Sequence, residues 1–199
     1  MSWAGVDLTT IAAVISYGGP LKVQSGDANY AVLQSMISSV SQKMEQYCSR
    51  RFQIATYTES RADLRSPLFP VKNPTVQSVS AVSVSYTGRL ANLSSIPDFE
   101  ISPDGNGINV WACLRPGVLV QVTYSGGLYT TTSDVLNNDP ALADACNMQV
   151  VSLWQRHTMP DRTGTTLNSG ETHWNAEYSL LKEVKATLDN RYSRRHAFQ

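Results

Sequence analysis

The longest regular pattern of apolar positions in the sequence runs from Asp27 to Phe52. Its large apolar side chains follow one another at steps of three or four residues, which places them on one face of an α-helix. These positions are Tyr30, Leu33, Ile37, Val40, Met44 and Tyr47. Asp27 fits the N-cap, and about 25 helical residues at about 1.5 Å each give a rod about 37 Å long. A rod of this length needs partners along it, so we expect the rest of the chain to be organised around it.

The opposite face of this predicted helix is polar but carries almost no charge. Serine and glutamine cost less to bury than lysine or glutamate, so the face suits either water or a neighbouring subunit. The residues that we predict for a subunit interface are Gln34, Ser38, Ser41, Gln42 and Glu45. Before this helix, Asp7 or Thr9 fits the cap of a short helix that Gly18 ends, with Leu8, Ile11, Ala12 and Ile15 as its apolar positions.

After Phe52 the apolar positions alternate with polar ones, which indicates β-strands. Valines separated mainly by serines between residues 76 and 84, continuing to Tyr86, predict one apolar face and one serine-rich face. The turn sequence Asp104-Gly105-Asn106-Gly107 predicts a hairpin between runs at 99–101 and 108–112. A last alternating run, 118–124, ends in Ser125-Gly126-Gly127. Residues 52–124 therefore predict an antiparallel sheet of four to six strands, closed into a small barrel or packed on itself.

Helical spacing returns at Asp139-Pro140, which suits an N-cap followed by the first helical position. This helix is predicted for 139–157, and residues 158–172 form a loop without an apolar pattern. A last helix is predicted for 173–192, starting near Trp174, and a basic tail follows it. The predicted fold class is α+β: a single domain, residues 1–199, with helices in 7–51 and after 139 and a β insertion at 52–124.

Charge and cysteine content limit the function classes. Lysine plus arginine and aspartate plus glutamate number 16 each, so no overall positive field favours general nucleic-acid binding. The odd number of cysteines, with no CxxC pair, indicates free thiols in a reducing cytoplasm. The N-terminal sequence has neither a basic n-region nor an apolar run of membrane-spanning length, so we expect no membrane association.

The candidates for catalysis are isolated residues. His157, His173 and His196 have no metal-site spacing, and a packed or solvated histidine explains each one. Cys48 precedes two arginines and could be an activated nucleophile or a buried thiol at a helix end. The turn at Asp104 resembles the start of a calcium loop but lacks the closing glutamate. We therefore predict no cofactor, no metal and no enzyme activity, with a composite site at a subunit boundary as the enzymatic alternative.

The basic C-terminal segment is the remaining candidate for binding. Cations favour a helix C-terminus, but aromatic side chains among them suit an anchor that docks on a partner. The predicted docking residues are Arg191, Tyr192, Arg194, Arg195 and Phe198. A DNA-binding module remains the alternative, and it would bind with a steep salt dependence.

Several segments in order along the chain resemble the head–tail connector proteins of tailed phages, of the adaptor or head-completion type. Residues 45–52, EQYCSRRF, followed by Tyr57-Thr58-Glu59, are similar to the E-x-Y-C-G-R-x-F and Y-T-E pattern of that family. The opening helix, the strand ending in Gly126-Gly127 and the helix after Pro140 come in the same order. Ser49 stands where the family usually has glycine, so we expect the helix to continue toward Arg51. The resemblance covers about residues 7–157.

The resemblance implies a structural virion protein of the phage neck, made in the bacterial host cytoplasm. Such a protein forms a ring, dodecameric like the portal protein to which it binds, and the ring extends the channel through which viral DNA passes without specific binding. The C-terminal segment would dock on the portal, and the far side of the ring would meet the next neck or tail protein. A ring needs two unlike faces on each subunit, and the weakly charged face of the long helix suits one of them. A tail-completion or stopper protein at another level of the neck is the alternative within this class.

Overall fold

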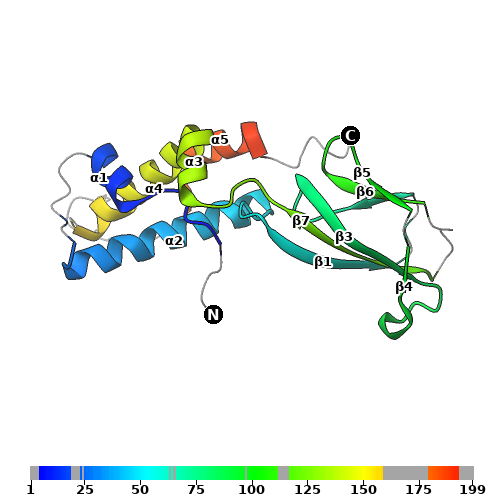
Figure 1. Cartoon of the computed structure of the whole chain (residues 1–199). Coiled ribbons are helices and arrows are strands. Elements are labelled where there is room, and N and C mark those ends of the chain that lie inside the picture. Colours follow the sequence, from blue (N-terminus) through cyan, green and yellow to red (C-terminus); the bar gives the residue numbers. More distant parts are fainter. Residues whose placement is uncertain are drawn as a thin grey trace, which may run out of the picture. The chain divides into compact units, whose positions relative to one another are not determined.

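The computed structural model describes residues 5–18, 23, 25–62, 64, 66–96, 98–111, 117–158 and 179–192. The chain divides into two compact units. A helical unit is drawn from the residues before Ser49 and after Thr130, and a β unit, Ser49–Thr130, is inserted between them. Figure 1 shows the helices and the strands of the two units, which confirm the predicted α+β class.

The helical unit contains α1 (Ile11–Gly18), α2 (Ala28–Cys48), α3 (Thr132–Asn138), α4 (Pro140–Thr158) and α5 (Lys182–Tyr192). The predicted long helix is α2, and four residues of its predicted apolar face are fully buried, namely Leu33, Ile37, Val40 and Met44. Tyr30 and Tyr47, at the two ends of the same face, have 37% and 38% of their surfaces exposed. Tyrosine at the ends of such a stripe can cover the core with its ring edge and keep its hydroxyl in water. Although α2 is the longest helix, α4 is the one that packs against all four others.

Local hydrogen bonds explain where the helices begin. Thr10, rather than Asp7 or Thr9, caps α1, because its Oγ1 accepts from the Ala13 amide at 3.2 Å. Asp139 caps α4 as predicted, accepting from the Leu142 amide at 3.2 Å. Helix α3 was not predicted; a capping box starts it, in which Thr131 and Asp134 exchange side-chain and backbone hydrogen bonds.

Two helix boundaries differ from the sequence prediction. α2 ends at Cys48, because Ser49 adopts a left-handed backbone with φ of 53°, so the expected continuation to Arg51 is wrong. α5 begins at Lys182 rather than near Trp174, which lies outside the described residues. The residue before it, Leu181, donates its amide to the buried Gln149 Oε1 at 2.7 Å, so a side chain of α4 anchors this start.

The β unit consists of two antiparallel sheets. One has the strand order β1 (Ala55–Ala62), β7 (Leu119–Gly126), β3 (Val76–Ser85), β4 (Ser94–Ser95). The other has the order β2 (Leu68–Pro70), β6 (Gly107–Val110), β5 (Phe99–Ile101). The predicted hairpin is confirmed as β5 and β6. The sequence underestimated the strand number because β2 and β4 are too short to show alternation.

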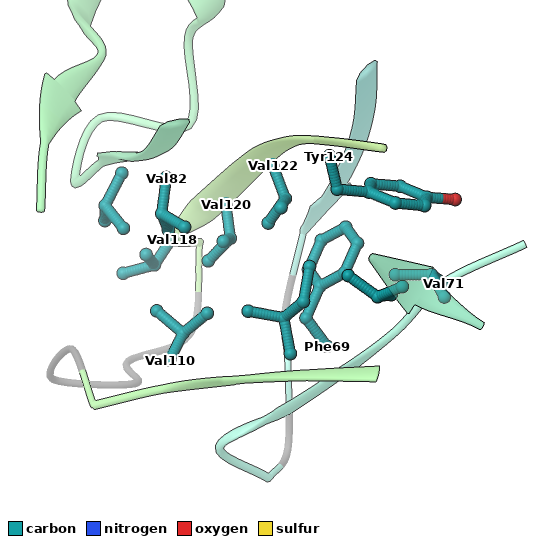
Figure 2. Close-up of a cluster of buried hydrophobic side chains, with 11 residues drawn as sticks. Phe69, Val71, Val82, Val110, Val118, Val120, Val122 and Tyr124 are labelled. Carbon is teal, nitrogen blue, oxygen red and sulfur yellow. The ribbon is translucent and has the colours of Figure 1, made fainter. Parts of the chain in front are cut away.

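The core of the β unit lies between the two sheets and consists mainly of valines. Figure 2 shows Val120 and Val122 of β7 directed toward Val110 of β6 and Phe69 of β2. All four of these side chains are fully buried. This packing explains why the unit needs strands with a small β-branched residue at alternate positions.

The two ends of the β unit are joined by backbone hydrogen bonds. The carbonyl of Phe52 accepts from the amides of Leu128 at 2.8 Å and Tyr129 at 3.0 Å, and the Ile54 amide donates to the carbonyl of Tyr129 at 2.8 Å. Gly127 permits this approach, because a Cβ there would lie 2.3 Å from the carbonyl oxygen of Gln53. The chain therefore enters and leaves the β unit at adjacent points.

Candidate functional site

The predicted subunit face of α2 divides into a buried and an exposed part. Ser41 and Glu45 are buried within the helical unit, with 0% and 3% of their surfaces exposed. The Oγ of Ser41 accepts from the Leu8 amide at 3.0 Å. Residues before α1 thus cover part of the face that sequence periodicity assigned to a neighbour. Ser41 and Glu45 are therefore corrected to internal packing positions, whereas Gln34 and Gln42 are exposed and Ser38 is half-buried.

A polar cluster joins this face to the segment before α1 and to α4. Asp7 accepts from the Gln34 Nε2 at 2.7 Å, and burial raises the pKa of its carboxyl despite hydrogen bonds from Ser38 and Gln34. The Thr9 hydroxyl donates to Asn147 Oδ1 at 2.6 Å, and both residues are buried. These hydrogen bonds thus pair Gln34 with Asp7 and Thr9 with Asn147, side chains that the sequence pattern alone would place in water.

Cys146 on α4 faces the same cluster and is fully buried, with its sulfur 3.9 Å from the Ser41 hydroxyl. Burial raises the pKa of its thiol to about 12, so almost no thiolate exists at neutral pH. Cys48, the candidate nucleophile of the sequence, is only 5% exposed. Both positions fit packed thiols better than reactive ones.

The described part of the predicted docking segment is held within the helical unit. Tyr192 is 8% exposed and belongs to the core, so it is not an accessible anchor. The Arg191 guanidinium pairs with Asp139 Oδ1 at 2.5 Å, and the carboxylate is almost fully buried. The Tyr47 hydroxyl donates to the carboxylate of Asp189, with both carboxylate oxygens at 3.0 Å. These contacts attach α5 to the helices around it, while Arg194, Arg195 and Phe198 lie outside the described residues.

The other candidates for chemistry have structural explanations where they are described. His157 is exposed beside Trp154, with ring centroids 5.9 Å apart, and His173 and His196 lie outside the described residues. The carboxylate of Asp104 forms hydrogen bonds within its own turn. It accepts from the Ser102 hydroxyl at 2.6 Å and from the Asn106 amide at 3.0 Å, and these bonds lower the pKa of its carboxyl. Within the described residues, no three His, Cys, Asp or Glu side chains are grouped to hold a metal, and no helix is long and apolar enough to span a bilayer.

A buried tyrosine and a carboxylate connect the strands of the β unit. The Tyr124 hydroxyl donates to Glu59 Oε1 at 2.5 Å and accepts from the Asn73 amide at 3.2 Å. Glu59 Oε1 also accepts from the Lys72 amide at 2.9 Å. Burial and the adjacent Glu59 raise the pKa of Tyr124 far above its ordinary value, so the hydroxyl stays protonated as a donor. This network holds the β2–β3 connection against β1 and β7.

The outer face of the four-stranded sheet carries mainly hydroxyl and amide side chains, with Ala62, Ala81 and Leu119 between them. We define this hydroxyl face by nine register positions: Thr56, Thr58, Ser60, Ser78, Ser83, Ser95, Gln121, Thr123 and Ser125. The Thr58 and Thr123 hydroxyls lie 3.1 Å apart, and Gln121 Nε2 donates to the Ser60 hydroxyl at 3.1 Å. Four of the nine side chains therefore already have partners within the sheet. The serine-rich face predicted from the alternation in β3 is one part of it.

The sequence pattern did not predict that large apolar side chains of the β unit are exposed. Tyr86 and Leu90, in the loop between β3 and β4, have 61% and 59% of their surfaces exposed, and Trp111 after β6 has 56%. The alternation of apolar residues placed Tyr86 on a strand, but β3 ends at Ser85. Gly88 has a positive φ in the turn that follows, and this glycine was the feature of the sequence that indicated the end of the strand.

The described residues thus define an α+β fold with a helical unit and an inserted β unit. No protein-family model matches the chain, and no curated protein matches it. Solved structures do share its fold. A chain in the virion of a native gene transfer agent particle aligns with a TM-score of 0.58 and 14% identity, covering 94% of this chain and 93% of that one. A chain in the neck of an empty gene transfer agent particle, computed with C6 symmetry, aligns with a TM-score of 0.57 and 13% identity over 78% and 82%.

At these identities the likeness establishes the fold. This chain has the fold of a component of a phage-like particle, and the resemblance to neck connector proteins is confirmed at that level.

Proposed function

We propose that this protein is a structural subunit of the neck of a phage-like virion, a ring-forming adaptor that joins the portal to the next neck or tail component. The observation that carries the proposal is the shared fold over nearly the whole of both chains, 94% of this one and 93% of the virion chain. A likeness of this extent includes both the helical unit and the inserted β unit. It therefore supports a similar building block rather than one shared motif.

The symmetry of the similar neck supports the proposed dodecameric ring. The similar neck was computed with C6 symmetry, and a dodecameric ring also has sixfold symmetry, so the two agree. A ring of this kind would extend the DNA channel. The equal numbers of acidic and basic residues, 16 each, suit a passage that does not hold DNA by many phosphate contacts.

Two surfaces are proposed for the contacts of such an adaptor. On α2, the exposed Gln34 and Gln42 and the half-buried Ser38 would meet a neighbouring subunit. Arg194, Arg195 and Phe198 follow the last buried residue of α5, Tyr192, and would dock on the portal. In this proposal the side chains act in assembly, with no catalysis and no cofactor.

The test compares the full-length chain with a version that stops after Tyr192. Stopping after Tyr192 keeps the buried end of α5, so that loss of binding reports on the tail and not on a damaged core. Each version is mixed with purified cognate portal rings, and mass and negative-stain images are recorded. A second test variant is a full-length chain in which Arg194, Arg195 and Phe198 are replaced by alanine.

The adaptor proposal expects the full-length chain to form a ring on the portal, and both altered chains to lose this binding. A full-length chain that ignores portal rings but binds isolated tails would contradict it and favour a tail-completion or stopper protein. Strong DNA binding that weakens steeply with salt would also contradict it.

A further inference from the structure

The loop between β3 and β4, residues 86–93, is ordered around two exposed apolar side chains. The Ser85 and Thr87 hydroxyls lie 3.1 Å apart, and Asn92 Nδ2 donates to Thr87 Oγ1 at 3.0 Å. The Arg89 amide donates to the Ser85 hydroxyl at 3.2 Å. A short 3-10 helix, η1 (Leu90–Asn92), follows within the same loop.

Such an ordered loop holds Tyr86 and Leu90 in water at 61% and 59% exposure. Exposed large apolar side chains on a preformed loop are typical of a protein contact, because little conformational entropy remains to be lost when they are buried. Tyrosine is also among the residues that most often dominate binding interfaces. We call Tyr86 and Leu90 the apolar knob.

The hydroxyl face offers a surface that such a knob can cover at low cost. None of its nine positions is charged, so covering it removes no ion from water. The Ser80 hydroxyl beside it donates to the Thr123 carbonyl at 3.0 Å, in addition to the internal pairs of Thr58 with Thr123 and of Ser60 with Gln121. Four of the nine side chains are thus paired with one another, so these four lose few hydrogen bonds to water when a partner covers the face.

A second copy of this chain fits both patches. A closed ring joins two unlike patches of the same subunit, and the knob and the hydroxyl face are two different patches of one unit. The formal net charge of +0 means that copies do not repel one another at neutral pH. We propose that in the assembled ring the apolar knob of one subunit packs on the hydroxyl face of the next. This inference rests on the proposed ring function and names one of its contacts.

The first test uses charge and truncation variants with matched controls. Ser60→Lys places a charge on the hydroxyl face, and Ser66→Lys places the same charge on an exposed serine outside it. The double variant Tyr86→Ser, Leu90→Ser removes the knob, and Trp111→Ser removes an equally exposed aromatic side chain elsewhere. Ring formation is measured by sedimentation over a range of concentrations, for the chain alone and with portal rings. The circular dichroism of each variant verifies its fold.

Ser60→Lys and the knob variant are expected to raise the concentration needed for ring formation by about tenfold or more, while both controls assemble like the wild type. A second measurement identifies the contact itself. In a Cys113→Ser background, a short bismaleimide is added to Ser60→Cys and Leu90→Cys chains, first separately and then mixed. The inference expects linked dimers only in the mixture, and a ladder of higher multiples when both cysteines are on one chain.

The outcomes separate this inference from the proposed function. Rings that form normally with both test variants and give no mixed cross-link overturn the contact but leave the adaptor function intact. A wild-type chain that stays monomeric both alone and with portal rings overturns both.

Discussion

Replacing Ser49 by glycine tests the end of the long helix. Ser49 follows Cys48, the last residue of α2, and has a φ of 53°, which an L-residue adopts at a cost of about 1–2 kcal/mol. Glycine removes this cost but loses more backbone entropy on folding, about 0.5–1 kcal/mol. The side chain of Ser49 is exposed, so its removal leaves no cavity. Ser49→Gly should therefore raise the free energy of unfolding by about 0.5–1 kcal/mol.

The assay is thermal unfolding followed by far-UV circular dichroism, with urea unfolding in parallel. For a chain of this size, 1 kcal/mol corresponds to about 2–4 °C in Tm, so a rise of about 1–4 °C is expected. The matched control is Ser39→Gly, the same substitution at an exposed position inside α2. It should lower the stability by about 0.5 kcal/mol, since glycine is a poor residue in a helix interior.

Equal destabilisation by both glycine substitutions would refute this reasoning. It would mean that Ser49 is helical in solution and that α2 continues toward Arg51, as the sequence alone suggested.

Three further predictions concern buried polar groups. Tyr124→Phe removes the hydroxyl bonded to Glu59 Oε1 at 2.5 Å and should lower the free energy of unfolding by about 1–3 kcal/mol in urea titrations, whereas the exposed Tyr86→Phe should change it little. The pKa of the Asp7 carboxyl is raised in the folded state, so the folded chain binds the carboxyl proton more tightly than the unfolded chain does. The stability that protonation of Asp7 confers is therefore lost as the pH rises through the folded-state pKa. Asp7→Asn should therefore gain stability relative to the wild type as the pH rises above 3.8, the ordinary pKa of the carboxyl, and a difference independent of pH would contradict this. Cys146, with a thiol pKa raised from 9.0 to about 12, should react with a thiol reagent about a thousandfold more slowly in the native chain than after unfolding. Rapid native labelling in a Cys48→Ser, Cys113→Ser background would contradict its burial.

Much of the fold could be predicted from local patterns. The spacing of Leu33, Ile37, Val40 and Met44 identified the buried stripe of α2, because helix geometry alone fixes which side chains share a face. The turn at Asp104 identified the β5–β6 hairpin, since its side chain can bond to the turn backbone wherever the rest of the fold lies. Asp139 and Pro140 marked the start of α4, because the capping bond from the Leu142 amide to Asp139 is also local.

The candidate site was predicted less well, because periodicity shows which residues share a face but not how many neighbours cover it. Ser41 and Glu45 were assigned to an open face, yet the segment before α1 and α4 surround that part of α2. Tyr192 was expected to be an accessible anchor, but its helix packs into the unit. Only contacts between residues far apart in sequence decide these positions.

The adjacent ends of the β unit make it separable from the rest of the chain. Residues 52–54 and 128–129 are hydrogen-bonded to one another, so a short glycine-containing linker in place of 49–130 would span the gap without stretching the chain. The same geometry would let a different module be grafted between Cys48 and Thr131. A chain with this junction could thus vary by exchange of the whole β unit, while the helical unit stays unchanged.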